Sequence, residues 1–111
     1  MRNITISNYY YGVVTLKPLT PFVKVLVLQL PSTVSIVLRG GNTSRLLVYL
    51  AIESGSNVTI VSPQLYRSAS GSTAYYSLLP PGVASVIVLN PFSKPITVGI
   101  EISVEGGEGA G

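Results

Sequence analysis

Apolar and polar residues alternate with a period of two near the end of the chain, where Ile96, Val98, Ile100, Ile102 and Val104 are separated by Thr97, Gly99, Glu101 and Ser103. Because successive side chains of a strand point to opposite faces of its sheet, this alternation predicts a strand with one buried and one solvated face. Residues 83–89 are instead a continuous apolar run, bounded by Pro80-Pro81-Gly82 and Asn90-Pro91. The length of this run, its valines and its turn-forming ends predict a strand covered on both faces.

Similar short segments recur along the whole chain. We expect further strands at residues 3–7, 13–16, 22–30, 34–39, 46–52, 58–61 and 74–79. Residues 40–42 and 90–95 carry hairpin-type turn sequences, so we interpret each as joining two neighbouring strands. The most apolar segments, 22–30 and 83–89, are predicted to be central strands. Residues 62–73 show little periodicity and are predicted to form the longest loop.

Eight or nine short strands at spacings of about 8 to 12 residues, without a helix pattern, are typical of an all-β sandwich or barrel. We therefore predict a single-domain antiparallel β-sandwich, jelly-roll-like, formed by residues 1–104. Residues 105–111 are rich in Gly and Glu and are predicted to be a flexible tail. Few charges are available to defend the strand edges, so edge-to-edge association is also expected.

The composition limits what the surface can be. The 111 residues are 47% apolar and only 10% charged, against about 25% charged in an ordinary soluble domain. The surface must therefore be built of uncharged polar residues and Tyr, or be covered by another subunit. The seven Lys and Arg residues are scattered singly and give a formal net charge of +3. Such a distribution permits an anionic partner without requiring one.

Several classes of chemistry lack the residues they need. Cys and His are absent and all four acidic residues are Glu, which excludes a disulfide, a thiol nucleophile and an imidazole base or ligand. Within residues 1–104 the only carboxylates are Glu53, in a turn, and Glu101, on the predicted wet face of a strand. We therefore predict a protein that is not an enzyme and that uses no cofactor and no metal.

No segment reaches the roughly 18 to 20 apolar residues of a membrane span, and the N-terminus lacks the apolar region of a secretory signal. We expect either a protein retained by the cell that makes it or a chain from which a targeting segment is missing.

Six tyrosines are candidate stacking surfaces for a carbohydrate or another flat ligand: Tyr9, Tyr10, Tyr11, Tyr66, Tyr75 and Tyr76. The alternative is that their rings pack on the edge of the core with wet hydroxyls, as suits an amphipathic side chain. A third hypothesis is a β-barrel that binds single-stranded nucleic acid, with Arg39 and Arg45 as phosphate contacts at one turn.

Three asparagines begin the Asn-X-Ser/Thr pattern of N-glycosylation, namely Asn3, Asn42 and Asn57. All three fall at a terminus or a predicted turn, where a glycan fits. Turns are also rich in Asn, Ser and Thr for local structural reasons. The pattern therefore favours an outward-facing protein only weakly.

The end of the chain resembles the small extracellular jelly-roll sandwiches of the pre-peptidase C-terminal type. The similarity lies in the LLPPG motif at residues 78–82, the valine-rich strand that follows, Asn90-Pro91 and the final alternating strand. Residues 47–50 are similar to the strand that follows an acidic pair in that family, and Ser44, Arg45 and Leu46 stand where the acids would be. The resemblance implies the fold and an accessory or cell-surface role, and it transfers no site residue.

Together these features predict a non-catalytic structural or interaction module of the cell surface, the extracellular space or a virion or filament. Self-association or contact with another protein would be its mode of action. A carbohydrate-binding accessory module is the alternative, and a nucleic-acid-binding barrel is third. A cluster of exposed tyrosines would favour carbohydrate binding, whereas exposed apolar patches or open strand edges would favour assembly.

Overall fold

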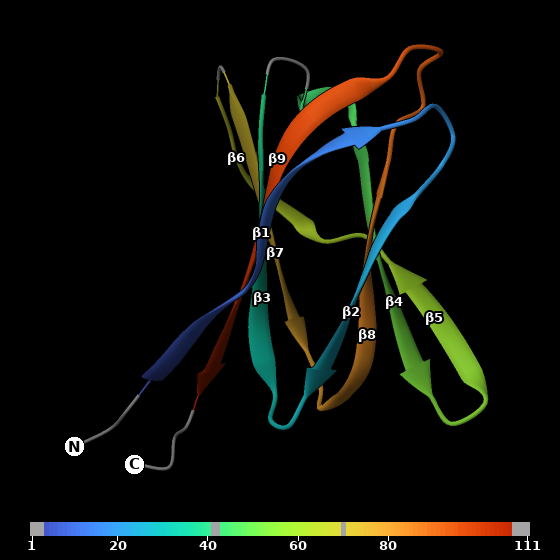
Figure 1. The fold of residues 1–111 in the computed structure, drawn as a ribbon. Helices are drawn as coiled ribbons and strands as arrows, with labels where there is room; N and C mark the ends of the chain where they lie inside the picture. The colour runs from blue at the N-terminus through green and yellow to red at the C-terminus, as the bar shows by residue number, and fades with distance from the viewer. Residues whose placement is uncertain (1–3, 41–42, 70, 108–111) are drawn as a thin grey trace.

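The computed structural model describes residues 4–40, 43–69 and 71–107, which form the fold in Figure 1. They contain nine β-strands and one 3₁₀ turn, η1 (Thr43–Arg45). The strands are β1 (Ile4–Leu16), β2 (Phe22–Leu28), β3 (Ser32–Arg39), β4 (Leu47–Ser54), β5 (Asn57–Val61), β6 (Gln64–Ala69), β7 (Ser72–Leu79), β8 (Gly82–Leu89) and β9 (Ile96–Gly107).

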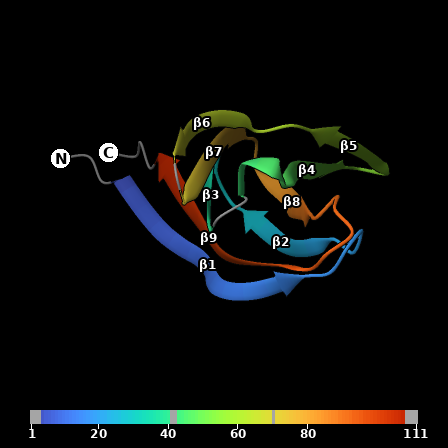
Figure 2. The same cartoon turned by 90° about the horizontal axis from the view of Figure 1, so that it is seen from above.

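The strands form two antiparallel sheets that face each other (Figure 2). One sheet has five strands in the order β1-β9-β3-β7-β6, and the other has four in the order β2-β8-β4-β5. The chain folds back on itself, so that β1 pairs with β9, β2 with β8, β3 with β7 and β4 with β5. These pairs alternate between the sheets, and β6 is added beside β7. This is the order of a jelly roll with one extra edge strand, which confirms the predicted fold class.

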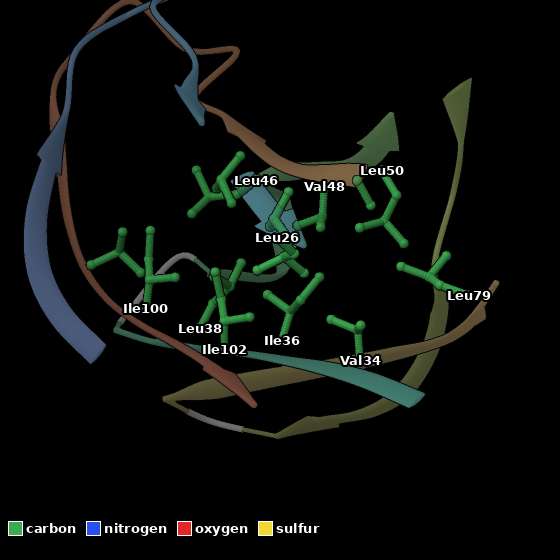
Figure 3. Close-up of a cluster of buried hydrophobic side chains, with 14 of the residues drawn as sticks. Leu26, Val34, Ile36, Leu38, Leu46, Val48, Leu50, Leu79, Ile100 and Ile102 are labelled. Atoms are coloured by element: carbon green, nitrogen blue, oxygen red, sulfur yellow. The ribbon is translucent and has the colours of Figure 1, made fainter. Parts of the chain in front are cut away.

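The core lies between the two sheets. It is built from the inward-pointing apolar side chains of strands in which inward and outward positions alternate. Figure 3 shows Leu26, Val48 and Leu50 of the four-stranded sheet facing the other sheet's core residues. Those are Val34, Ile36, Leu38, Ile100 and Ile102, all 0% exposed. On β3 and β9 the neighbouring side chains in the sequence point outward, as the period of two predicts.

Asn90 fixes the two loops at one end of the sandwich to each other. Its side chain is fully buried and makes three hydrogen bonds with the backbone. Nδ2 donates to the carbonyl oxygens of Leu16 (3.0 Å) and Lys94 (2.7 Å), and Oδ1 accepts from the Phe92 N–H (2.9 Å). The Leu19 N–H also donates to the Asn90 carbonyl. The β1–β2 and β8–β9 connections are therefore held together by one amide.

Both predicted hairpins are wrong, because each of these connections crosses from one sheet to the other. Residues 40–46 lead from β3 in the five-stranded sheet to β4 in the four-stranded sheet, and residues 90–95 lead from β8 to β9. The residues that permit a tight reversal of the chain also permit an arch between sheets. Turn chemistry alone therefore does not distinguish the two.

Four further predictions about strands need correction. The two segments predicted at 3–7 and 13–16 are not separate strands, because residues 4–7 and 13–16 belong to one strand, β1, whose register shifts between Asn8 and Tyr10; residue 3 lies outside the described residues. The predicted loop at 62–73 contains β6 and the start of β7. The apolar segment at 22–30 forms an edge strand, β2, although β8 is central as predicted. The final strand, β9, ends at Gly107 instead of residue 104.

Candidate interaction surface

The outer side of the four-stranded sheet is almost entirely apolar. Its positions follow from the register, because residues directly opposite each other in antiparallel strands share a face. We call this surface the apolar face; it comprises Val23, Val25 and Val27 of β2, Val83, Ser85, Ile87 and Leu89 of β8, Leu47, Tyr49, Ala51 and Glu53 of β4, and Val58 and Ile60 of β5.

The side chains of the apolar face are open to solvent, most of all on its two outer strands. Val25 is 51% exposed on β2, and Val58 and Ile60 are 60% and 56% exposed on β5. Across the middle of the face, Val25, Ser85, Ala51 and Ile60 are successive partners on the four strands. The two smallest side chains, Ser85 and Ala51, therefore lie at the centre between larger ones. Within the described part of the chain no element covers this side of the sheet (Figure 2).

Charge is confined to the margin of the apolar face. Glu53 lies next to the turn between β4 and β5 and is the face's single ionisable carboxylate. Lys24 of β2 has the opposite orientation, because it pairs with the buried Val86 and points between the sheets. Such depletion of charge is typical of the core of a protein interface.

The outer side of the five-stranded sheet has a different chemistry. We call it the hydroxyl face, because Thr15, Thr33, Ser35, Ser72, Thr97 and Ser103 lie on it. Arg39 at the end of β3 and Glu101 of β9 form an ion pair on this face, with Arg39 Nη2 donating to Glu101 Oε1 at 3.0 Å. Exposed apolar side chains are found toward its outer strands, with Val13 on β1 and Leu78 on β7.

A shallow hollow of about 510 Å³ lies on the hydroxyl face over β3 and β7. Thr33, Ser35 and Ala74 are among the residues that line it, together with Arg39 and Tyr76. The Tyr76 hydroxyl donates a hydrogen bond of 2.9 Å to Gln64 Oε1 on β6. The hollow combines two tyrosines, Tyr75 and Tyr76, with hydroxyl groups and with Arg39, which is paired with Glu101. These groups suit a neutral polar ligand better than an anion.

The structure separates the tyrosines that the sequence singled out. Tyr10 points inward, and its ring lies 5.4 Å from that of Phe22. Tyr75 packs against the core while also bordering the hollow, and desolvation raises the pKa of its hydroxyl. Tyr11 and Tyr76 share the hydroxyl face but lie on β1 and β7, three strands apart. The side chains of Tyr9 and Tyr66 lie outside the described part of the structure.

Three of the four open strand edges, those of β1, β6 and β2, are better defended than the sequence indicates. The registers of β1 and β6 shift next to Tyr9 and Tyr66, and such bulges disfavour edge pairing. On β2 the inward-pointing Lys24 places its Nζ 5.2 Å from the centre of the Tyr10 ring. That ring passes over Gly12, where a Cβ would lie 2.6 Å from the Tyr10 hydroxyl. An inward charge on an edge strand opposes the addition of another strand.

Among the described residues, the basic side chains Arg45 and Lys94 line one hollow together. Arg39 lies on the hydroxyl face with Glu101, and the guanidinium of Arg45 lies 6.0 Å from the centre of the Phe92 ring at the loop end of the sandwich. The two arginines proposed as phosphate contacts thus have partners within the chain. Asn57 is exposed at the start of β5, while Asn3 and Asn42 lie outside the described residues.

The described residues do not bring three or more His, Cys, Asp or Glu side chains together around a metal-sized space. Nor does this part of the chain contain a helix with the length and apolar character to cross a bilayer.

No protein-family model matches the chain, and no curated protein sequence or solved structure is significantly similar to it. The resemblance to pre-peptidase C-terminal domains therefore stays a prediction from the strand pattern. The chemistry of the two outer faces is what remains to indicate a function.

Proposed function

We propose that the protein is a non-catalytic structural module that acts through surface contacts and self-association. Its setting would be the cell surface, the extracellular space, or a particle such as a virion or filament. The observation that carries this proposal is the apolar face, a sheet surface with charge only at its margin, exposed on a small sandwich. Contiguous apolar patches above a few hundred Å² are rare on monomers and mark interaction sites.

The first test is the solution mass of the purified protein, measured by light scattering over a wide range of concentrations. We expect a defined oligomer, or growth into larger particles, as the concentration rises. A strict monomer at the highest concentration would contradict self-association as the mode of action.

A second candidate function is binding of a neutral carbohydrate in the hollow of the hydroxyl face. Tyr76 favours it, because an aromatic ring beside hydroxyl and charged groups offers both a stacking surface and hydrogen-bond partners for a sugar. A glycan-binding screen tests this candidate with Tyr76→Ala, and with Tyr11→Ala as the matched control on the same face. Loss of binding in the first variant alone would support it. Equal binding by both variants would place any glycan elsewhere.

A further inference from the structure

We infer that the apolar face docks on the same face of a second copy of this chain, forming a closed dimer with four β-layers. This inference rests on the proposed self-association and adds the surface, the partner and the symmetry. In such a dimer the two four-stranded sheets would pack face to face, about 10 Å apart, like the two sheets of a sandwich.

The absence of charge makes a second copy a suitable partner. In a twofold interface the same patch meets itself, so every charge on it approaches its own equivalent or a neighbour of that equivalent. The apolar face has no charge in its interior, and Glu53 is at its margin. A charged partner would find no complementary charge in this interior, whereas an identical apolar surface is complementary to it.

The heights of the side chains on the apolar face also favour packing against a second copy of the same face. Ser85 and Ala51 are small and central, and they are flanked by Val25 and Ile60 in the same row. Alternation of small and large side chains allows two facing layers to interdigitate. A twist between the two sheets would place large side chains of one copy over the small centre of the other.

The size of the face approaches that of a specific contact. Four strands of about seven residues cover roughly 19 Å by 24 Å, a footprint of about 450 Å². Two such footprints come to about 900 Å² before the relief of the side chains is added, which is close to the roughly 1,000 Å² of a specific interface.

Three of the four strand edges and the hydroxyl face are less suited to pairing between copies, whereas β5 carries neither a bulge nor an inward charge. The bulges in β1 and β6 and the inward Lys24 on β2 disfavour edge-to-edge addition. On the hydroxyl face, burial would desolvate the Arg39–Glu101 pair and many hydroxyl groups.

The decisive experiment compares one charge placed on each outer face. Val25→Lys puts a lysine on the exposed edge of the apolar face, and Val13→Lys is its matched control on the exposed edge of the hydroxyl face, where Val13 is 68% exposed. Mass is measured by sedimentation equilibrium, and folding by circular dichroism. We expect the wild type and Val13→Lys to dimerise alike, and Val25→Lys to dimerise at least 100-fold more weakly while remaining folded.

A second pair covers the case in which Val25→Lys does not fold. Ser85→Lys changes the centre of the apolar face, and Ser35→Lys is its counterpart, half-buried on the central strand β3. The same loss of dimer is expected for Ser85→Lys alone.

The remaining outcomes overturn the inference in distinguishable ways. An oligomer that survives both lysines on the apolar face, or growth without limit, would contradict a closed dimer through this face and leave self-association intact. A monomeric wild type would overturn the proposed function as well. If that monomer bound phosphatidylcholine vesicles, and Val25→Lys did not, a lipid surface would be the occupant instead of a second copy.

Discussion

The outer faces of the two sheets differ although their inner faces are made of the same Val, Leu and Ile residues. On β9 every second residue is polar or Gly, so the five-stranded sheet has a dry inner side and a wet outer side. On β8 three of the four outward residues, Val83, Ile87 and Leu89, are apolar like the inward ones, and the fourth is Ser85. A sheet with two apolar sides has the composition of a middle layer in a larger assembly, while the isolated sandwich covers only one of those sides.

The largest difference in stability cost between the buried and the exposed side of the four-stranded sheet is expected on β4. Leu50 is 0% exposed and points inward, whereas Leu47 is 38% exposed on the apolar face. Leu50→Ala should lower the free energy of unfolding by about 2–5 kcal/mol at any protein concentration, because it leaves a cavity in the core. Leu47→Ala should cost less than about 1 kcal/mol in dilute protein and more as the protein associates. Urea unfolding at two protein concentrations about 100-fold apart measures both costs. Equal costs in dilute protein would contradict the assignment of the two sides.

Removal of the amide at the loop end should destabilise the fold without affecting either outer face. Asn90→Ala leaves the buried carbonyl of Leu16 and the part-buried backbone groups of Phe92 and Lys94 without their partner, at an expected cost of about 1–3 kcal/mol in unfolding free energy. The affinity with which folded molecules dimerise should not change. The control is Asn57→Ala, at an exposed position. A change in dimer affinity at constant folded fraction would show that the loop end contributes to the interface.

Ammonium sulfate should strengthen association through the apolar face, whereas sodium chloride should weaken the ion pair on the hydroxyl face. Ammonium sulfate strengthens burial of apolar surface, so it should tighten the association. The exposed ion pair on the hydroxyl face should contribute only about 0.2–1 kcal/mol, and less as sodium chloride is added. A double-mutant cycle with Arg39→Gln and Glu101→Gln measures the pair. Weaker association in ammonium sulfate would indicate an electrostatic interface and contradict the apolar face as the contact.

The smallest expected effect reports on the inner side of the five-stranded sheet. Burial raises the pKa of Tyr75 above its ordinary value of 10.0 because it disfavours the charged phenolate. The unfolded chain therefore loses this proton first, and the associated stability, intact below about pH 10, should decrease as the pH rises through the folded-state pKa. Thermal unfolding between pH 8 and pH 11 should show a smaller alkaline loss for Tyr75→Phe than for the wild type. Equal losses would indicate a wet environment at this position.

The sequence carries part of the difference between the faces. The strict alternation at residues 96–104 predicts a solvated outer side, and the unbroken apolar run at 83–89 predicts two covered sides. The structure confirms the first for the five-stranded sheet. For the second it buries one side of β8 and leaves the other half-buried. The composition had left open whether the surface is built of uncharged polar residues and Tyr or is covered by another subunit.

Other features of the fold leave no signal in the local sequence. A turn sequence does not record whether the next strand joins the same sheet or the opposite one, so both sheet crossings resembled hairpins. The strand β6 pairs with β7 alone, and its segment QLYRSA has no apolar alternation. An edge strand needs few buried side chains, so neither β6 nor the edge position of β2 could be derived from residue patterns. The role of Asn90 depends on backbone groups of loops far apart in the sequence.

The order of the strands also determines when the apolar face exists. Its middle strand is β8, the last but one in the chain, which lies between β2 and β4. During synthesis from the N-terminus, β2 and the β4–β5 pair have no partner in common until β8 is made, and β9 must then join β1 to β3. An incomplete chain therefore lacks the surface on which we expect copies to associate. On the association proposed above, copies would recognise each other only after β8 has joined β2 to β4.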